Sequence, residues 1–208
     1  MARLTGDPIV FAMTGASGAP YGIRLLAQLV AARRPVSLIV SAHGFRLLRT
    51  ESDVGDVAGL RRAVGPAAWD ACVTVHDDGD RGAAPASGSA LSAGMVICPC
   101  SMGTLASIAA GTSRSLVERA ADVTLKERRK LILVTRETPL SAIHLENMLR
   151  LTYAGAVVLP AAPGFYHRPT TVDQLVDFVV ARVLDQLGVA QALVPRWGSG
   201  AVRPRRRR

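Results

Sequence analysis

Short apolar runs alternate with longer segments of helical periodicity along most of the chain. The apolar runs cover residues 9–13, 36–40, 95–98, 131–134 and 156–159, with a weaker run at 72–75. Runs of four or five mostly apolar residues are typical of strands that are buried on both faces. Strands that alternate with helices predict a single α/β domain with a doubly wound, mostly parallel, Rossmann- or flavodoxin-like central sheet.

The segments between these runs carry the helical patterns. They predict helices over residues 23–30, 45–50, 105–110, 116–129, 141 to about 153, and 172–187. The pattern is weaker from 53 to 71, where Leu60, Val64 and Trp69 are the expected packing residues. Residues 77–86 begin acidic and become rich in Gly, Ala and Pro, which predicts a surface loop.

A glycine-rich turn, residues 14–18, joins the first apolar run to the first helical segment. A strand, a glycine-rich turn and a helix in this order present backbone N–H groups and a helix N-terminus to an anion. The glycines let the backbone approach a ligand, and Ser17 can donate a hydroxyl hydrogen bond. The turn predicts a phosphate-bearing ligand at Gly15 to Gly18, with a turn that binds nothing as the alternative.

The same turn is also found in short-chain dehydrogenases, but the rest of the chain argues against that class. Such enzymes need a Tyr followed four residues later by a Lys, and neither Tyr21, Tyr153 nor Tyr166 has one. An acidic residue would also be expected after the second strand to hold a ribose. That position is Ser41, which suits a phosphate or a flavin edge better.

A second junction of strand, loop and helix follows the run at 95–98. Its loop places hydroxyls at Ser101 and Thr104 near a helix start, where Ser101 can also serve as the N-cap. Such junctions lie at the carboxyl ends of parallel strands, where ligands bind. Cys98 and Cys100 have no partner His or Cys at metal-ligand spacing, so we expect packing residues and no metal site.

Composition and charge narrow the function classes. No apolar run reaches the roughly 18 residues that span a membrane, no signal peptide is recognisable, and three cysteines suit a reducing cytoplasm. The net charge is +9, but Arg203 and Arg205–Arg208 contribute five of these charges and leave +4. No basic patch interleaved with aromatic residues is present, so no specific nucleic-acid partner is expected. We expect the domain to span residues 1–194, followed by an arginine-rich extension at 195–208.

Five stretches in their joint order resemble the UbiX-like flavin prenyltransferases, a branch of the flavin-binding cysteine-decarboxylase-like fold. The likeness covers roughly residues 9–197. The five stretches are residues 15–19 (GASGA), 94–101 (GMVICPCS), 119–129 (RAADVTLKERR), 136–140 (RETPL) and 165–169 (FYHRP).

This resemblance implies a reaction that periodicity cannot show. Enzymes of this family join a dimethylallyl group from dimethylallyl monophosphate to N5 and C6 of reduced FMN. The product, prenylated FMN, serves a UbiD-like decarboxylase, and no metal is needed. The resemblance also implies a homododecamer with sites between subunits.

Site residues follow from the same resemblance, position by position. Those that match flavin contacts are Gly15, Ala16, Ser17, Ser41, Ser101, Met102, Gly103, Thr104 and Arg119. Those that match the dimethylallyl phosphate cluster are Lys126, Arg136, Tyr166 and Arg182. Those with expected catalytic roles are Glu137 as acid/base, Ser17, Glu51, Lys126, and Trp197 beside the prenyl group. Cations and a phenol suit a leaving phosphate because they stabilise its growing charge.

Several alternatives remain open at this point. Glu137 could simply pair with Arg136. A flavin-dependent cysteine decarboxylase of the same fold would need a His after the first helix, whereas His43 follows the second strand. A non-catalytic flavin-binding protein would leave Glu137 and the phosphate cluster unexplained. The sequence does not distinguish a monophosphate from a diphosphate donor, and it does not identify the decarboxylase that is served.

Overall fold

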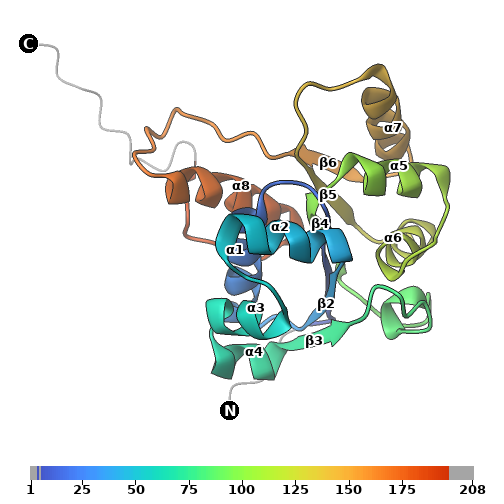
Figure 1. Cartoon of the computed structure of the whole chain (residues 1–208), viewed down its shortest axis with the longest axis horizontal. Helices are drawn as coiled ribbons and strands as arrows, with labels where there is room; N and C mark the ends of the chain where they lie inside the picture. Colours follow the sequence, from blue (N-terminus) through green and yellow to red (C-terminus); the bar gives the residue numbers. More distant parts are fainter. Residues whose placement is uncertain (1–3, 5, 197–208) are drawn as a thin grey trace, which may run out of the picture.

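The computed structural model describes residue 4 and residues 6–196, which form a six-stranded parallel sheet (Figure 1). The spatial order is β3-β2-β1-β4-β5-β6. The strands are β1 (Ile9–Met13), β2 (Val36–Val40), β3 (Val73–His76), β4 (Gly94–Cys100), β5 (Leu131–Thr135) and β6 (Val157–Pro160). All six strands lie within one or two residues of the predicted runs, and the predicted doubly wound α/β class is confirmed.

Helices cover both faces of the sheet. They are α1 (Ala19–Ala31), α2 (Ala42–Ser52), α3 (Val57–Val64), α4 (Pro66–Cys72), α5 (Met102–Ala110), α6 (Leu116–Lys126), α7 (Ala142–Tyr153) and α8 (Val172–Leu187), with a 3₁₀ turn, η1, at Ala84–Ala86. Figure 1 shows α1–α4 and α8 on one side of the sheet and α5–α7 on the other.

Two apolar clusters fill the space between the layers, and β1 contributes to both. Ile9, Phe11 and Met13 pack into the cluster with α1 and α8, whereas Val10 and Ala12 pack into the cluster with α5 and α6. Successive strand residues point to opposite faces, so a strand covered on both sides must be apolar throughout. This burial is why β1 reads as an unbroken apolar run in the sequence.

The strand order reverses between β1 and β4. From β1 the chain moves outward through β2 to β3, and from β4 it moves the other way through β5 to β6. The carboxyl ends of β1 and β4 therefore flank the crevice where doubly wound folds bind ligands. Helix α8 returns to pack on α1, where Arg24 donates two hydrogen bonds to Asp177 at 2.7 and 3.1 Å.

Some helices differ from their predicted extents. The first begins at Ala19, with Pro20 in its first turn, where the missing N–H of proline costs nothing. The second is longer because Ser41 caps it, and its hydroxyl accepts from the Gly44 N–H. The weak segment at 53–71 forms two short helices, since Gly65 and Pro66 end one and begin the next. The helix predicted to reach residue 129 ends at Lys126.

Within the described residues, no helix is long and apolar enough to cross a membrane. The predicted boundary between residues 194 and 195 stays a prediction, because residues 197–208 lie outside the described part of the chain.

Candidate active site at the carboxyl edge of the sheet

Thr14 ties the ends of β1 and β4 together. Its side chain is 2% exposed, and its Oγ1 donates to the carbonyl of Pro99 at 3.0 Å. The same oxygen accepts from the N–H of Ser101 at 2.9 Å. A buried hydroxyl that both donates and accepts fixes two backbone segments relative to each other. The glycine-rich turn and the start of α5 are therefore held side by side at the crevice.

Two positions in the glycine-rich turn require glycine. A Cβ on Gly15 would lie 2.6 Å from the Cβ of His43, which is closer than carbon atoms approach in proteins. Gly18 has a φ of 122°, which side chains rarely tolerate. The turn thus packs directly against the first turn of α2 at Gly15.

A carboxylate accepts from two amides at the N-terminus of α1. The N–H groups of Gly18 and Ala19 both donate to Oε2 of Glu51, each at 2.8 Å. The carboxylate comes from the last turn of α2 and lies at one end of the turn where the sequence predicts a phosphate-bearing ligand. A phosphate at those two amides would face this negative charge, and the predicted ligand position at Gly15 to Gly18 stays a prediction.

Glu51 lies at the centre of a polar cluster. The Ser17 side chain hydrogen-bonds to it, and Arg136 contributes a nearby positive charge. Arg136 Nε also donates to the Ser17 carbonyl at 3.3 Å. Burial raises the pKa of Glu51, but the hydrogen bonds from Gly18, Ser17 and Ala19 and the charge of Arg136 outweigh it, and its pKa lies below its ordinary value. At neutral pH Glu51 is therefore ionised and acts as an acceptor.

This cluster predicts a pH-dependent loss of stability in Glu51→Gln. A carboxyl whose pKa is lowered by folding stabilises the fold above its unfolded pKa, and this contribution fades as pH falls through the folded pKa. The variant is expected to melt below wild type at neutral pH, with the difference complete above about pH 5 and vanishing in acid. Thermal melts across pH measure it, with the exposed carboxyl of Asp53 (Asp53→Asn) as control. A Tm difference that does not change with pH would contradict the assignment.

A cavity of about 250 Å³ opens beside this cluster, and the N-caps of three helices line it. Ser41 caps α2, Ser101 caps α5 and Ser115 caps α6. The complete lining is Thr14, Gly15, Ser41, His43, Asp78, Ser101, Thr104, Ser115, Val117 and Glu118. Four of the predicted flavin contacts, from three separate stretches of the sequence, thus meet at one cavity.

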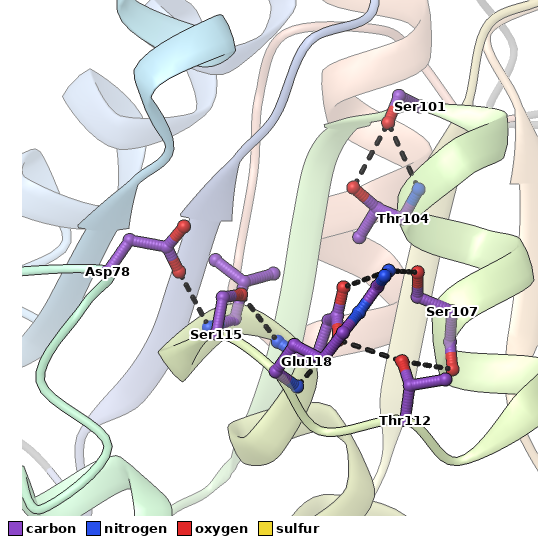
Figure 2. A network of polar contacts seen from close by, with 9 residues as sticks. Asp78, Ser101, Thr104, Ser107, Thr112, Ser115 and Glu118 are labelled. Atoms are coloured by element: carbon purple, nitrogen blue, oxygen red, sulfur yellow. Dashed lines mark hydrogen bonds and ion pairs between the residues drawn. The ribbon is translucent and has the colours of Figure 1, made fainter.

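The three helix starts differ in whether their amides are occupied. Asp78 fills the first turn of α6, where its carbonyl accepts from Leu116 at 2.7 Å and its Oδ1 accepts from Val117 at 3.0 Å. Figure 2 shows Asp78 reaching across to this turn. Among the described residues, no group accepts from the amides of Met102 and Gly103 at the start of α5. This helix start remains open to an anion.

Glu118 lines the cavity and belongs to a polar network with the turn before α6, which Figure 2 shows. Its Oε2 accepts from the Arg114 N–H at 2.7 Å and from Thr112 Oγ1 at 2.9 Å. Arg114 Nη2 in turn donates to Ser107 Oγ at 2.8 Å. Burial raises the pKa of Glu118, yet these hydrogen bonds lower it below its ordinary value overall. The carboxylate is thus held in place by α5 and by the α5–α6 turn.

A second cavity, of about 310 Å³, brings Tyr166 and Arg182 together. Tyr166 lies on the segment that crosses from β6 to α8, and its ring meets Phe178 edge-on at 5.7 Å. His167 stacks on the same Phe178 ring, with centroids 5.2 Å apart. This pair of predicted substrate-binding residues is therefore assembled within one chain.

Glu137 is exposed on the loop after β5. Its Oε1 accepts from the N–H of Thr138 at 3.1 Å. Within the described chain it makes no ion pair with Arg136, whose Nε donates to the carbonyl of Ser17 instead. The simple ion-pair interpretation of Glu137 is therefore not supported.

Cys98 and Cys100 are fully buried in β4. Burial and the neighbouring thiol raise the pKa of Cys98, and burial raises the pKa of Cys100 to about 12. Protonated, inaccessible thiols pack rather than react, as expected. No cluster of His, Cys, Asp and Glu suited to a metal ion occurs in the part of the chain that the structure describes.

Known proteins share this architecture. The flavoprotein family matches residues 2–184 of the chain. The flavin prenyltransferase UbiX of Pseudomonas aeruginosa is 53% identical over 199 residues, which cover 92% of this chain and 94% of that protein. The chain belongs to the UbiX-like flavin prenyltransferases.

Solved structures agree with this membership. AnUbiX (PadA1), in complex with FMN and dimethylallyl pyrophosphate, is 40% identical with a TM-score of 0.86, over 93% of this chain and 98% of that chain. A dodecameric FMN-dependent UbiX-like decarboxylase from Escherichia coli O157:H7 is 42% identical with a TM-score of 0.85, over 92% and 100% of the two chains. The cysteine decarboxylase TvaF is only 18% identical with a TM-score of 0.56, a likeness that shows the fold alone.

Not all residues that the UbiX-like resemblance assigns lie together in one chain. Arg119 Nη1 donates to Asp122 at 2.7 Å and its Nε to the Ala86 carbonyl at 3.3 Å, outside the serine-lined cavity. Lys126 pairs with Glu127, at the end of α6. Trp197 lies outside the described residues.

Lys126 and Arg136 lie toward opposite ends of the parallel strands. Lys126 precedes β5, whereas Arg136 follows it, and the strand between them has five residues. At roughly 3.3 Å per residue the strand alone is about 16 Å long. The Lys126 amino group also lies beside Gly88, before the start of β4, where a Cβ would be 2.8 Å from Nζ. One chain does not bring these two cations to the same phosphate.

Sequence reasoning missed several residues of the serine-lined cavity. Ser115 and Glu118 have the Ser-x-x-Glu spacing of a capping box, a signal that could have identified both. The Ser115 hydroxyl does accept from the Glu118 N–H, at 3.4 Å. Asp78 has no such signal in the sequence. Its partners on α6, Leu116 and Val117, are 38 and 39 residues away, and no local sequence pattern connects them to Asp78.

Proposed function

We propose that this chain transfers a dimethylallyl group from dimethylallyl monophosphate to N5 and C6 of reduced FMN, releasing phosphate and prenylated FMN. The single observation that carries the proposal is the convergence at the carboxyl edge. There, the glycine-rich turn, Ser17 with Glu51 and Arg136, and the serine-lined cavity meet at the reversal of strand order. Membership in the UbiX-like family supports the same reaction.

The serine-lined cavity fits the phosphate and ribityl groups of FMN. Ser41, Ser101 and Thr104 supply hydroxyls, and the open start of α5 at Met102 and Gly103 supplies amides for a phosphate. Asp78 and Glu118 in the same cavity can accept from ribityl hydroxyls. Gly15 and Ala16 let the flavin approach the turn. Bound reduced FMN supplies the nucleophilic N5 and C6.

The remaining residues bind the phosphate of the donor, stabilise its charge or transfer protons. Arg136, Lys126, Arg182 and the Tyr166 phenol bind the phosphate of the donor and stabilise the charge that grows as it leaves. Glu137 is exposed and makes no ion pair with Arg136, and it moves protons between the flavin and the phosphate. Ionised Glu51 accepts from Ser17 and fixes its hydroxyl at the turn. Arg119 contacts the flavin and Trp197 faces the prenyl group.

We propose that the functional unit is a homododecamer with sites between subunits. Lys126 and Arg136 can then meet, with each cation coming from a different copy, and Arg119 can reach a flavin bound by a neighbour. The dodecameric Escherichia coli relative supports this assembly. We also propose that a UbiD-like decarboxylase receives the product, and that both work in the cytoplasm, which the three free cysteines suit.

Helix α7 offers the surface for this assembly. Its inner face packs on α5 through Leu151 and Met148, whereas the rest is exposed and carries large apolar side chains among the charged residues Glu146 and Arg150. Ile143 is 68% and Tyr153 82% exposed, and the exposed large apolar residues of the helix are Ile143, Leu145, Leu149 and Tyr153, with Leu140 just before its start. Contiguous apolar patches of more than a few hundred Å² are rare on monomers and mark interaction sites.

Substitution of Leu149 by Glu is expected to break the assembly into smaller species. A charge buried without a partner in an interface costs several kcal/mol, which is enough to dissociate a contact of ordinary size. Size-exclusion chromatography with light scattering measures the mass, and Ala68→Glu on exposed α4 adds the same charge elsewhere. A dodecamer that persists in Leu149→Glu would show that α7 is not an interface.

The reaction itself is tested with the native protein. It is incubated without oxygen with reduced FMN and dimethylallyl monophosphate, and the released flavin is analysed by mass spectrometry. A mass gain of one prenyl unit is expected. Recovery of unmodified FMN from folded, flavin-loaded protein would overturn the proposal and favour a decarboxylase or a flavin-binding role.

A further inference from the structure

The cavity that holds Tyr166 and Arg182 also contains a carboxylate that the proposed reaction does not use. Asp185 lies one turn after Arg182 on α8 and lines the same 310 Å³ cavity. Its side chain is only 17% exposed, although both of its arginine partners are mostly exposed. An acidic group in the wall of an anion-binding cavity calls for an explanation, because it repels the ligand.

Asp185 is shared between two arginines. Its Oδ2 accepts from Arg182 Nη1 at 3.1 Å, and its Oδ1 accepts from Arg196 Nη2 at 3.2 Å. The segment after α8 that leads to Arg196 forms a turn of its own, in which Gln191 Oε1 accepts from the N–H groups of Leu193 and Val194 at 2.8 and 3.3 Å. The arrangement therefore joins two cations from separate elements to one anion.

The net charge of this group sets what it binds best. Arg182, Arg196 and Asp185 together contribute a net charge of +1 beside Tyr166, in addition to the charges of Lys126 and Arg136 in the proposed donor site. A phosphate monoester carries about −1.5 to −2 at pH 7, and a diphosphate carries roughly one further negative charge. Each added negative charge on the donor is attracted by the arginines but repelled by Asp185. The carboxylate thus penalises the diphosphate more than the monophosphate.

We propose that Asp185 is a specificity-determining residue that biases this cavity toward the monophosphate donor by cancelling one of its two arginine charges. The inference rests on the proposed prenyl transfer and decides between the two donors that the sequence leaves open. It assigns Arg196 a role as well, because Arg196 supplies the second cation that Asp185 offsets.

The test compares Asp185→Asn with wild type. Asparagine keeps an oxygen that can accept from an arginine but removes the charge. In the variant, kcat/KM for dimethylallyl diphosphate relative to the monophosphate is expected to rise roughly three- to tenfold, the effect of one unit charge acting over several ångströms near the surface. The matched control is Asp177→Asn, which also removes an arginine-paired carboxylate from α8 but lines a different cavity. Its ratio is expected to equal that of wild type.

A binding measurement separates failure of this inference from failure of the proposed reaction. Inorganic phosphate and pyrophosphate are titrated into each protein, and the ratio of their Kd values is expected to shift toward pyrophosphate in Asp185→Asn by the same factor. This readout needs no prenyl transfer, so it stands even if no flavin product forms. A ratio unchanged from wild type, or changed equally by Asp177→Asn, would overturn the role of Asp185.

Discussion

Glu137→Gln is expected to lower prenyl transfer by about 10²–10⁴-fold, the usual contribution of a positioned acid or base. Glutamine has nearly the same shape but cannot exchange a proton. Glu137 is exposed, and the contact recorded for it is with the neighbouring Thr138 N–H, so the fold is expected to tolerate the change. Flavin binding is expected to persist, because the residues of the serine-lined cavity lie on other elements.

Single-turnover assays with reduced FMN and dimethylallyl monophosphate measure this effect. The control is Asp173→Asn, which neutralises an exposed carboxyl at the start of α8 and is expected to keep wild-type activity. FMN titration and a thermal melt show whether each variant is folded and loaded. If Glu137→Gln keeps more than about a tenth of the wild-type rate, a role in proton transfer is untenable.

The sequence predicted most of the fold because burial on both faces of the sheet leaves a clear pattern. A strand such as β5 is covered by helices on both sides and is apolar from Leu131 to Val134, so this four-residue run could be recognised directly in the sequence. Helix ends were less accurate. The start of α2 depends on Ser41 as a cap, and residues 53–71 resolve into two helices only through Gly65 and Pro66.

The site was predicted where its residues are local to a motif and was missed where they come from afar. The glycine-rich turn and the Ser101–Thr104 helix start are each contiguous in the sequence. By contrast, Glu51 accepts from the N–H groups of Gly18 and Ala19, which lie 33 and 32 residues away in the sequence. No local sequence pattern predicts this contact. A prediction based on the turn alone therefore misses the carboxylate that accepts from these two amides.

The arrangement of Lys126 and Arg136 leads to the second strong prediction. The two cations lie beyond opposite ends of strand β5. A site that uses both must therefore take each of them from a different copy of the chain. Lys126→Ala and Arg136→Ala are each expected to reduce prenyl transfer by about 10²-fold or more, because each removes a charge from the leaving phosphate. Mixing the two variants should then restore activity.

The fraction of activity that is restored by mixing the two variants can be calculated. When the two variants are unfolded together and reassembled in equal amounts, random assortment places an intact Lys126 opposite an intact Arg136 in roughly a quarter of the sites. Activity is expected to return to about that fraction of wild type. The control mixes wild type with a chain that carries both substitutions, which also leaves about a quarter of the sites intact and calibrates reassembly. If the control recovers activity and the mixture of single variants does not, Lys126 and Arg136 act within one chain or not at one site, and the proposal of sites shared between subunits through these residues is wrong.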